Sequence, residues 1–315
     1  MAALEVLHSL VASAGLPPVL GTKVIGKRAE GLDNILVKAV LADDREVLLR
    51  LSKSTTPSPQ PRATFLEAQG VGAPRLYSSD DSGAALVEFV PGSTLADLVA
   101  TGADSDRIWR LTGAAFGRVH AVSFPAPLQG AVGPESIMLR PLDPVDQLIS
   151  KINFSTGWVS RHRPNALPAL GRLEEFVWRR AEEIRAETPC LVHGDANLLN
   201  IVVGVEQVTL IDWDFPAVRY PIDELSALDE HVYLNGATGL PGAFFDGYGR
   251  EVPRDLLLAY RMVGCLNWLS SDDWDQWARD TTVPVPARNR LDRWHDRLVE
   301  WVDQMPQLSD RLIGS

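Results

Sequence analysis

Up to position 90, apolar residues gather in short runs separated by turn residues. These runs are rich in valine, isoleucine and leucine, and they predict five strands, at 22–25, 35–41, 46–51, 76–77 and 84–90. We expect an amphipathic helix ahead of them over 1–15 and a shorter helix near 62–69. The segment 54–61 holds three prolines and is predicted to be a loop. This part of the chain therefore favours a small antiparallel sheet.

Beyond position 92 the apolar spacing changes to the three-and-four pattern of helices. Helices are predicted at 94–99, 104–120, 173–186, 256–269 and 291–302. Two short apolar runs, 201–203 and 208–211, predict a β-hairpin inside this helical part. A Pro-Gly pair at 91–92 marks the change of pattern. We therefore expect an α+β fold of two lobes, at 1–92 and 93–315.

Composition agrees with two packed lobes and excludes several classes of protein. The chain has 315 residues, of which 45% are apolar and 23% charged, so it can bury a large interior. Its formal charge of −11 disfavours nucleic-acid or anionic-membrane partners. Two cysteines make no disulfide framework, which favours a reducing, cytoplasmic compartment. The N-terminal segment lacks a signal-peptide cleavage site, and no apolar run approaches the length of a membrane span.

The most informative polar residues are His193-Gly194-Asp195, followed by Asn200 and Asp212. Asn200 stands five residues after Asp195, and Asp212 follows the second strand of the predicted hairpin. Phosphoryl transfer needs a carboxylate beside the attacking hydroxyl and oxygen ligands for Mg²⁺. Protein kinases space their catalytic Asp and Asn in the same way. Singly these would be ordinary turn residues, but the combined spacing rarely arises by chance.

At these residues the chain resembles the aminoglycoside phosphotransferase and choline kinase family, whose signature is His-Gly-Asp-x4-Asn followed by Ile-Asp-Trp-Asp/Glu. The resemblance extends to 221–225, where the family has Pro-x-x-Asp-Leu and this chain reads Pro-Ile-Asp-Glu-Leu. It implies a protein-kinase-like fold, ATP or GTP with Mg²⁺, and a small-molecule alcohol as acceptor. The residue roles that it implies are Asp195 as catalytic base, Asn200 and Asp212 as Mg²⁺ ligands, Asp223 as a structural carboxylate and His193 as a buried orienting residue. Asp214 is open to two interpretations, a contact near the metal or a solvated turn.

The resemblance also implies a nucleotide site in the N-terminal lobe. Gly31 and Asn34 resemble a family turn at which the backbone approaches phosphates. Arg50, on the third predicted strand, stands where protein kinases have the lysine that holds the phosphates. The alternative is a surface arginine on an edge strand. Glu67 is the only acid on the helix that follows, so it is the candidate partner of Arg50.

Glu88 and Val90 match the connection between the lobes, where the backbone would bond the edge of the adenine ring. Pro91, Gly92 and a helix start follow in the order that the family has. Here main-chain geometry would carry the function, so the side chains say little.

Substrate recognition is expected from the helical lobe. The segment 271–277 packs three carboxylates and two indoles together, with Asp272, Asp273 and Trp274 as candidate contacts. Asp229 and Glu230 form a second acidic pair. Such groups suit a cationic acceptor, such as an aminoglycoside antibiotic or an amino alcohol. The alternative for 271–277 is a solvated helix start with its tryptophans packed inward.

Two further interpretations of the sequence compete with an active kinase. The stretch 21–28 nearly spells a P-loop, but Arg28 replaces the Ser or Thr that would bind Mg²⁺ and its centre resembles a strand, so we interpret it as coincidence. A pseudokinase-like module would hold a nucleotide or a partner without turnover. The complete set Asp195, Asn200 and Asp212 favours an active phosphotransferase.

Overall fold

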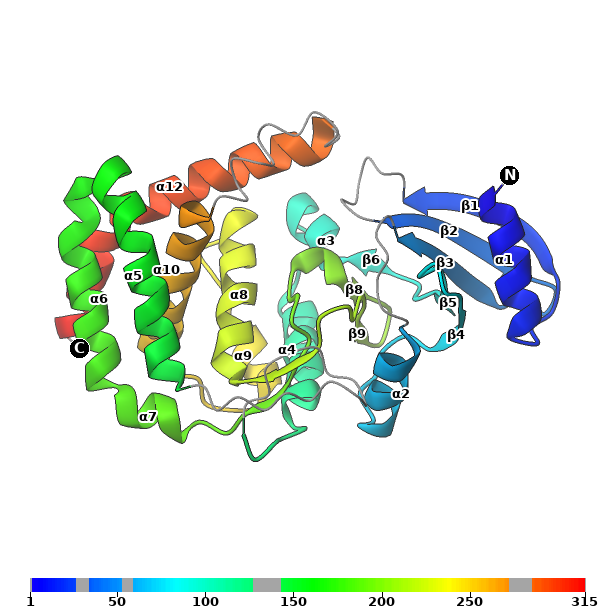
Figure 1. The fold of residues 1–315 in the computed structure, drawn as a ribbon, viewed down its shortest axis with the longest axis horizontal. Helices are drawn as coiled ribbons and strands as arrows, with labels where there is room; N and C mark the ends of the chain where they lie inside the picture. The colour runs from blue at the N-terminus through cyan, green and yellow to red at the C-terminus, as the bar shows by residue number, and fades with distance from the viewer. Residues whose placement is uncertain (1, 27–33, 53–58, 127–142, 272–284, 315) are drawn as a thin grey trace.

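The computed structural model of this chain describes residues 2–26, 34–52, 59–126, 143–271 and 285–314. Its elements separate into a small sheet lobe and a larger, mainly helical lobe (Figure 1). The predicted α+β, two-lobed, protein-kinase-like fold class is confirmed. None of the helices in the described ranges is long and apolar enough to cross a membrane.

The N-lobe is built on a five-stranded antiparallel sheet with the strand order β1-β2-β3-β5-β4. Its elements are α1 (Ala2–Ser13), β1 (Val19–Gly26), β2 (Asn34–Leu41), β3 (Glu46–Ser52), α2 (Gln60–Ala68), β4 (Leu76–Ser79) and β5 (Ala85–Glu88). Helix α1 covers one face of the sheet (Figure 1), and Leu7 and Leu10 join Leu86 in the buried cluster between them. β1 includes the centre of the P-loop-like stretch, which is therefore a strand and not a phosphate-binding loop.

The alternation of side chains in β3 decides which way Arg50 faces. Val47 and Leu49 are fully buried in the cluster beneath α1. Successive residues of a strand point to opposite faces, so Leu48 and Arg50 lie on the other face. Arg50 thereby reaches side chains of the C-lobe.

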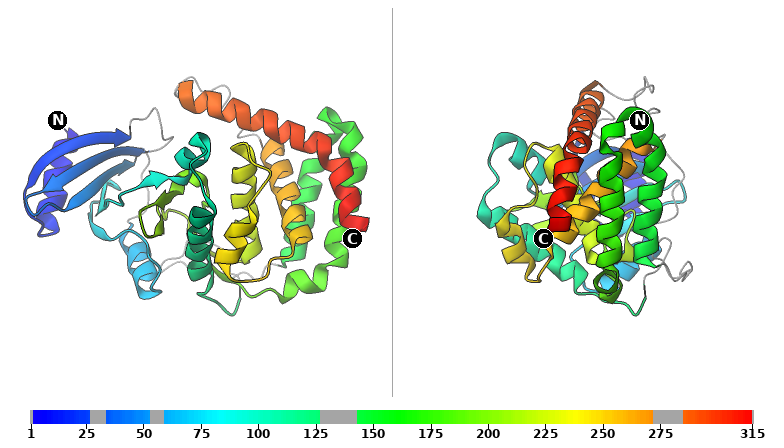
Figure 2. Two further views of the ribbon diagram at one scale, coloured as in Figure 1. Left: turned by 180° about the vertical axis from the view of Figure 1, so that it is seen from behind. Right: turned by 90° about the vertical axis from the view of Figure 1, so that its left-hand side faces the viewer.

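Helices form most of the C-lobe, around one large apolar cluster. Its helices are α3 (Leu95–Thr101), α4 (Asp106–His120), α5 (Pro144–His162), α6 (Leu167–Arg179), α7 (Ala181–Ala186), α8 (Pro221–Leu234), α9 (Gly242–Tyr248), α10 (Arg254–Ser270) and α12 (Val285–Gly314), with short 3-10 turns η1 (Pro164–Ala166) and η2 (Leu198–Asn200). Helices α5 and α6 lie on the side away from the N-lobe sheet, and α12 crosses the other helices from the side of the N-lobe to α6 (Figure 1 and Figure 2). The predicted helix 173–186 is divided between α6 and α7, and 291–302 is part of a much longer α12.

Two small sheets of the C-lobe carry the motif residues. β7 (Cys190–Val192) pairs with β10 (Ala217–Arg219), and β6 (Ser93–Thr94) pairs with β8 (Ile201–Val203), which pairs with β9 (Val208–Leu210). The predicted hairpin is confirmed as β8 and β9.

Gly92 attaches the connection between the lobes to this second sheet. Its φ is +148°, and a Cβ at this position would overlap the carbonyl oxygen of Val203. Any other residue would therefore push the connection away from β8.

Candidate functional site

The loop 193–200, which we call the catalytic loop after the role predicted for Asp195, begins at the end of β7 with a buried histidine. His193 Nε2 lies 2.8 Å from the carbonyl oxygen of Ile211, and its Nδ1 lies 3.3 Å from the backbone N–H of Asp195. The carbonyl can only accept and the amide can only donate, so the proton sits on Nε2 and Nδ1 accepts. His193 thus ties the catalytic loop to the segment after β9, in the orienting role that the sequence suggests.

Gly194 is required by the turn that follows. Its φ is +84°, in the left-handed region, and a Cβ would overlap the carbonyl oxygen of Phe215. The Gly of the His-Gly-Asp motif therefore allows the catalytic loop to pack against the segment that carries Asp212.

Asp195 and Asn200 are brought into direct contact. Asn200 Nδ2 donates to the carboxylate Oδ2 of Asp195 at 2.8 Å and to its main-chain oxygen at 3.1 Å. Asn197 Nδ2 donates to the other carboxylate oxygen at 3.0 Å, while its own Oδ1 caps η2 by accepting the N–H groups of Leu199 and Asn200. The two asparagines hold the Asp195 carboxylate in a defined orientation.

Asp212 follows β9 in a left-handed conformation, with φ of +63°. Burial raises the pKa of its carboxyl group, and the nearby charge of Arg50 opposes this shift. Oδ1 lies 2.9 Å from Arg50 Nη1 in an ion pair, yet this buried oxygen accepts no hydrogen bond within the described part of the chain. A strained backbone and an unsatisfied carboxylate oxygen are typical of a functional position.

The oxygen atoms around Asp195 fit Mg²⁺. Asp212 offers its unsatisfied Oδ1, and Asn200 makes both of its side-chain hydrogen bonds through Nδ2, which leaves its Oδ1 as a possible ligand. Within the residues described, no cluster of three or more His, Cys, Asp and Glu forms a metal cage. A metal held by Asn200 and Asp212 would take its remaining ligands from phosphates and water, as Mg²⁺ commonly does.

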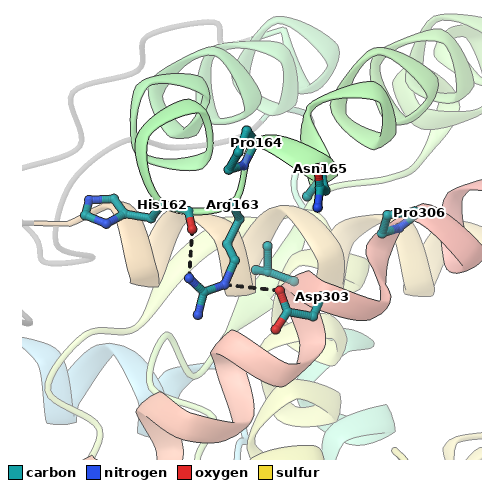
Figure 3. A pocket seen from close by; sticks show the side chains of 8 residues that line it. His162, Arg163, Pro164, Asn165, Asp303 and Pro306 are labelled. Carbon is teal, nitrogen blue, oxygen red and sulfur yellow. Dashed lines mark hydrogen bonds and ion pairs between the residues drawn. The ribbon is translucent and has the colours of Figure 1, made fainter.

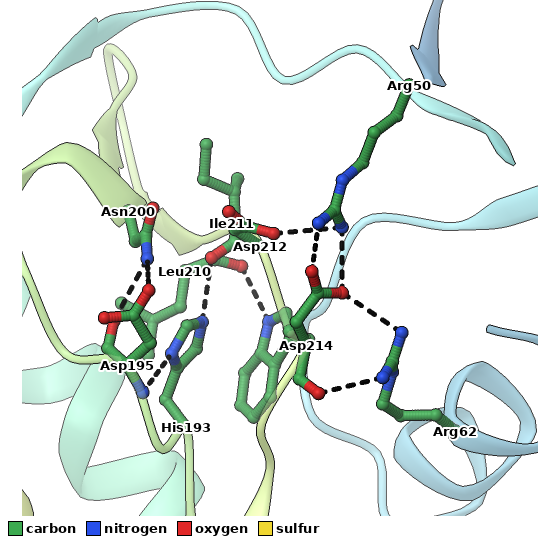
Figure 4. A network of polar contacts seen from close by, with 10 residues as sticks. Arg50, Arg62, His193, Asp195, Asn200, Leu210, Ile211, Asp212 and Asp214 are labelled. Atoms are coloured by element: carbon green, nitrogen blue, oxygen red, sulfur yellow. Dashed lines mark hydrogen bonds and ion pairs between the residues drawn. The ribbon is translucent and has the colours of Figure 1, made fainter. Parts of the chain in front are cut away.

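Arg50 meets this site from the N-lobe through a second carboxylate, Asp214 (Figure 4). Its guanidinium binds both carboxylate oxygens of Asp214, with Nη1 donating to Oδ1 at 2.8 Å and Nη2 donating to Oδ2. Arg62, from α2, donates to the main-chain oxygen of Asp214 at 2.8 Å and to its Oδ1 at 3.1 Å. Burial raises the pKa of Asp214, but the hydrogen bonds and charges of the two arginines outweigh it and hold the pKa below its ordinary value.

The prediction that Glu67 pairs with Arg50 is wrong. Glu67 is exposed on α2, and no ion pair of its carboxylate occurs among the described residues. Asp214 and Asp212 pair with Arg50 instead, so Asp214 is not a solvated turn residue, and its contact near the metal position stays a prediction. Arg62 was not indicated by the sequence, because its partner lies 152 positions away.

The backbone N–H groups in the connection between the lobes differ in whether they are hydrogen-bonded. The N–H of Glu88 donates to the carbonyl of Arg75 at 2.8 Å, and that of Phe89 donates to Glu46 at 3.4 Å. Val90 follows outside any strand, and its N–H makes no backbone hydrogen bond within the described ranges. Gly31 lies outside the described residues, and of Asn34 only the backbone, at the start of β2, is described.

Glu224, and not Asp223, supports the catalytic loop. Its Oε1 accepts the N–H of Gly194 at 2.7 Å, and its Oε2 lies 2.8 Å from Nε2 of His120. The ring of His120 continues to the hydroxyl of Tyr248 at 2.9 Å. Glu224 occupies the Asp position of the Pro-x-x-Asp-Leu pattern, with one more methylene, so the structural role expected for Asp223 belongs to its neighbour. Burial raises the Glu224 pKa, but the His120 contact and the Gly194 amide outweigh it and lower it.

Asp229 and Glu230 are buried in the C-lobe and make no hydrogen bond or ion pair with the catalytic loop among the described residues, which disfavours the substrate role expected for them. Asp229 Oδ2 pairs with Arg261 at 2.7 Å, and its Oδ1 accepts the N–H of Leu240 at 2.6 Å. Glu230 is buried on the side of α8 that faces α10, with its Oε2 near Gly264. A carboxylate enclosed between helices cannot meet a ligand in the site. The other candidates, Asp272, Asp273 and Trp274, lie outside the described residues.

The burial of Glu230 predicts a pH-dependent stability. Its pKa is raised to about 8 by burial, from an ordinary value of 4.5. Between these values the folded protein keeps a proton that the unfolded chain releases, so rising pH lowers the free energy of unfolding. Glu230→Gln, a neutral group of the same size, should flatten this decline in urea unfolding between about pH 5 and pH 8. Glu175→Gln, at an exposed position of α6, is the control, and equal slopes for wild type and Glu230→Gln would contradict the prediction.

Two tryptophan rings pack against the side chain of His231. The ring of His231, on α8, lies edge-on to Trp268 of α10 at 6.0 Å and to Trp294 of α12 at 5.3 Å. Burial lowers the pKa of His231 to about 4, and the charge of Asp195 opposes this. The imidazole is therefore neutral at pH 7. The sequence did not indicate this cluster, because three separate helices supply it.

The structure also holds two cavities away from the catalytic loop. One, of about 330 Å³, is lined by residues of α5, η1 and α12, including Arg163 and Asp303, which form an ion pair at 3.1 Å (Figure 3). The other, of about 210 Å³, adjoins the Asp229–Arg261 pair. Neither is lined by a residue of the catalytic loop or by Asp212.

Solved structures share this architecture over almost the full chain. A choline/ethanolamine kinase family protein from Mesorhizobium loti has a TM-score of 0.65 at 19% identity, covering 99% of this chain and 98% of that one. A choline kinase from Streptococcus pneumoniae has a TM-score of 0.58 at 15% identity, covering 95% and 100%. A spectinomycin phosphotransferase in complex with ADP and spectinomycin has a TM-score of 0.60 at 14% identity, covering 96% and 98%. At these identities the likeness shows the fold alone.

Sequence comparison identifies the family more directly. No curated protein matches the chain at a significant level. The model of the phosphotransferase enzyme family, however, matches residues 28–261, a range that includes Arg50, the catalytic loop and Asp212. The chain therefore belongs to the phosphotransferase enzyme family.

Proposed function

We propose that this protein transfers the γ-phosphoryl group of ATP to a hydroxyl group of a small molecule. The observation that carries the proposal is the convergence of Asp195, Asn200 and Asp212 in the C-lobe with Arg50 from the N-lobe. Two structural neighbours were solved with ATP or ADP, which supports ATP as the donor. The N–H of Val90, which makes no backbone hydrogen bond within the described ranges, is proposed to bond the adenine edge, whereas Gly31 and Asn34 remain predicted phosphate contacts.

In the proposed reaction Asp195 accepts the proton of the acceptor hydroxyl. The hydroxyl oxygen forms a bond to the γ-phosphorus while the bond from that phosphorus to the bridging oxygen breaks, and the nucleoside diphosphate leaves. Asn197 and Asn200 hold the carboxylate of Asp195 by its two oxygens, so that its remaining lone pairs face the hydroxyl. Mg²⁺, when bound by Asn200 and Asp212, would offset the negative charge of the phosphates.

The acceptor is proposed to be a small alcohol of the amino-alcohol or aminoglycoside type. The structural neighbours include choline and ethanolamine kinases and complexes with gentamicin and spectinomycin. The assay is release of ADP in the presence of Mg²⁺ and a panel of choline, ethanolamine, gentamicin and spectinomycin. Transfer to at least one alcohol is expected. Nucleotide binding without transfer to any acceptor would instead identify a binding module.

Replacing Asp212 tests the metal side of the site. Asp212→Asn keeps the size of the side chain but removes the charge that attracts a divalent cation. The affinity for Mg–ADP in a calorimetric titration should fall at least about tenfold, on the scale of a lost charged contact. The affinity for ADP in EDTA should change much less. Equal Mg–ADP affinity for wild type and Asp212→Asn would remove Asp212 from the metal site.

A further inference from the structure

Two arginines from different elements of the N-lobe meet on one carboxylate of the C-lobe. Arg50 of β3 and Arg62 of α2 both donate to Asp214. The three side chains are only 22%, 19% and 19% exposed, so they are shielded from most of the surrounding water. Ion pairs in such partly buried positions are stronger than pairs on an open surface.

This arrangement reverses the charges used in protein kinases. There the strand lysine is held by a glutamate on the neighbouring helix, so both partners belong to the N-lobe. Here the helix supplies a cation, Arg62, which cannot attract Arg50. The carboxylate that holds both arginines, Asp214, lies in the C-lobe. The position of Arg50 therefore depends on the segment that carries the metal ligand.

Asp214 is linked to the candidate metal ligand through the backbone. Its N–H donates to the main-chain oxygen of Asp212 at 2.9 Å, which closes a tight turn over residues 212–214 that begins at the left-handed Asp212. Arg62 binds both the main-chain oxygen and the carboxylate of Asp214, so it holds backbone and side chain at once. Arg50, by contrast, is shared between Asp214 and Asp212. A triphosphate would compete for Arg50, and a divalent metal would compete for Asp212.

We propose that Arg62 is a positioning residue for metal–nucleotide binding: it keeps the turn of residues 212–214 in place through Asp214 when Arg50 moves to the phosphates. The inference rests on the proposed function, because it assumes that Arg50 and Asp212 bind a metal–nucleotide complex. It assigns to α2 the support of a turn in the C-lobe, whereas the role that a helix glutamate has in protein kinases, holding the strand cation, belongs here to Asp214.

The test is calorimetric titration of the full chain with AMP-PNP, in Mg²⁺ and separately in EDTA. Arg62→Met keeps the apolar stem and removes the guanidinium. Its affinity for Mg–AMP-PNP should fall about tenfold, the scale of couplings between contacting charged groups, with a much smaller change in EDTA. The ratio of the two affinities therefore falls. General damage to the fold would lower both affinities alike. Arg62→Lys should restore only part of the ratio, since one ammonium cannot reproduce the fork.

The matched control is Arg45→Met, because Arg45 forms its ion pair with Asp43 on an exposed turn of the same lobe. It should leave both affinities unchanged. In an Asp214→Asn background, Arg62→Met should lower the ratio less than it does in wild type, because the guanidinium there keeps its hydrogen bond to the main-chain oxygen of position 214 but has no ion pair to lose. Should Arg62→Met fail to fold, Asp214→Asn alone should lower the Mg²⁺-to-EDTA ratio.

The outcomes separate this inference from the proposed function. If wild type binds Mg–AMP-PNP and both Arg62→Met and Asp214→Asn keep its Mg²⁺-to-EDTA ratio, the role of Arg62 is refuted while the proposed function stands. If wild type binds no nucleotide, the proposed function fails and this inference fails with it.

Discussion

Asp195→Asn is expected to lower kcat at least ~10²-fold, the scale of a lost general base, in an assay of ADP release with an accepted alcohol. The amide keeps the size of the carboxylate but does not take up the hydroxyl proton. Affinity for Mg–ADP should stay within about threefold of wild type, because in the proposed reaction Asp195 acts on the acceptor and not on the nucleotide.

Asp106→Asn provides the control for this prediction. Asp106 is an exposed carboxylate in the first turn of α4, so its loss should leave kcat unchanged. A kcat for Asp195→Asn equal to that of wild type would exclude Asp195 as the base, and the proposed mechanism would have to be abandoned.

Among the substitutions proposed here, Glu224→Ala is expected to cause the largest loss of stability, about 2–6 kcal/mol, because two buried donors each lose their acceptor at a cost of about 1–3 kcal/mol. The substitution leaves the N–H of Gly194 and the Nε2 of His120 without their acceptor, in a site from which water is excluded. The turn at Gly194 loses its support, so kcat should fall as well. Urea unfolding and the ADP-release assay measure the two effects.

Glu224→Gln separates charge from packing at the same position. Its amide oxygen can still accept from Gly194, so the loss of stability should be smaller than for Glu224→Ala. Asp223→Asn is the matched control on the same turn of α8. Burial raises the pKa of Asp223, and its carboxylate makes no hydrogen bond or ion pair within the described residues, so the amide should cost little. A larger loss for Asp223→Asn than for Glu224→Ala would show that the wrong carboxylate has been assigned.

Local sequence predicted the elements with a clear apolar pattern. The strands of the N-lobe stand out as short apolar runs between turn residues, and helix α4 stands out by apolar positions at three-and-four spacing. Helix α8 was not predicted, because eleven of its fourteen residues are buried and no polar face marks its period. The first turn of α8 nevertheless supports the catalytic loop, so an element that periodicity does not indicate is central to the site.

The residues of the candidate site likewise fall into those that local sequence predicted and those that depend on the fold. Asp195, Asn200 and Asp212 were predictable from sequence, because they lie within one hairpin-containing segment and their spacing is set by local turns. Which of Asp223 and Glu224 supports the catalytic loop depended on which side of α8 meets Gly194. The partner of Arg50, Asp214, lies 164 positions away along the chain, so local sequence could not indicate it. Asp229 was expected from the sequence to bind a cationic substrate, but in the folded C-lobe its carboxylate forms an ion pair with Arg261.

By itself the sequence determined the family, the two lobes and the residues that carry the proposed chemistry, because short-range spacing encodes all three. Only the tertiary structure decided which charges neutralise one another. Ion pairs depend on distances of a few ångströms between side chains from separate elements, and no local pattern records which elements will meet.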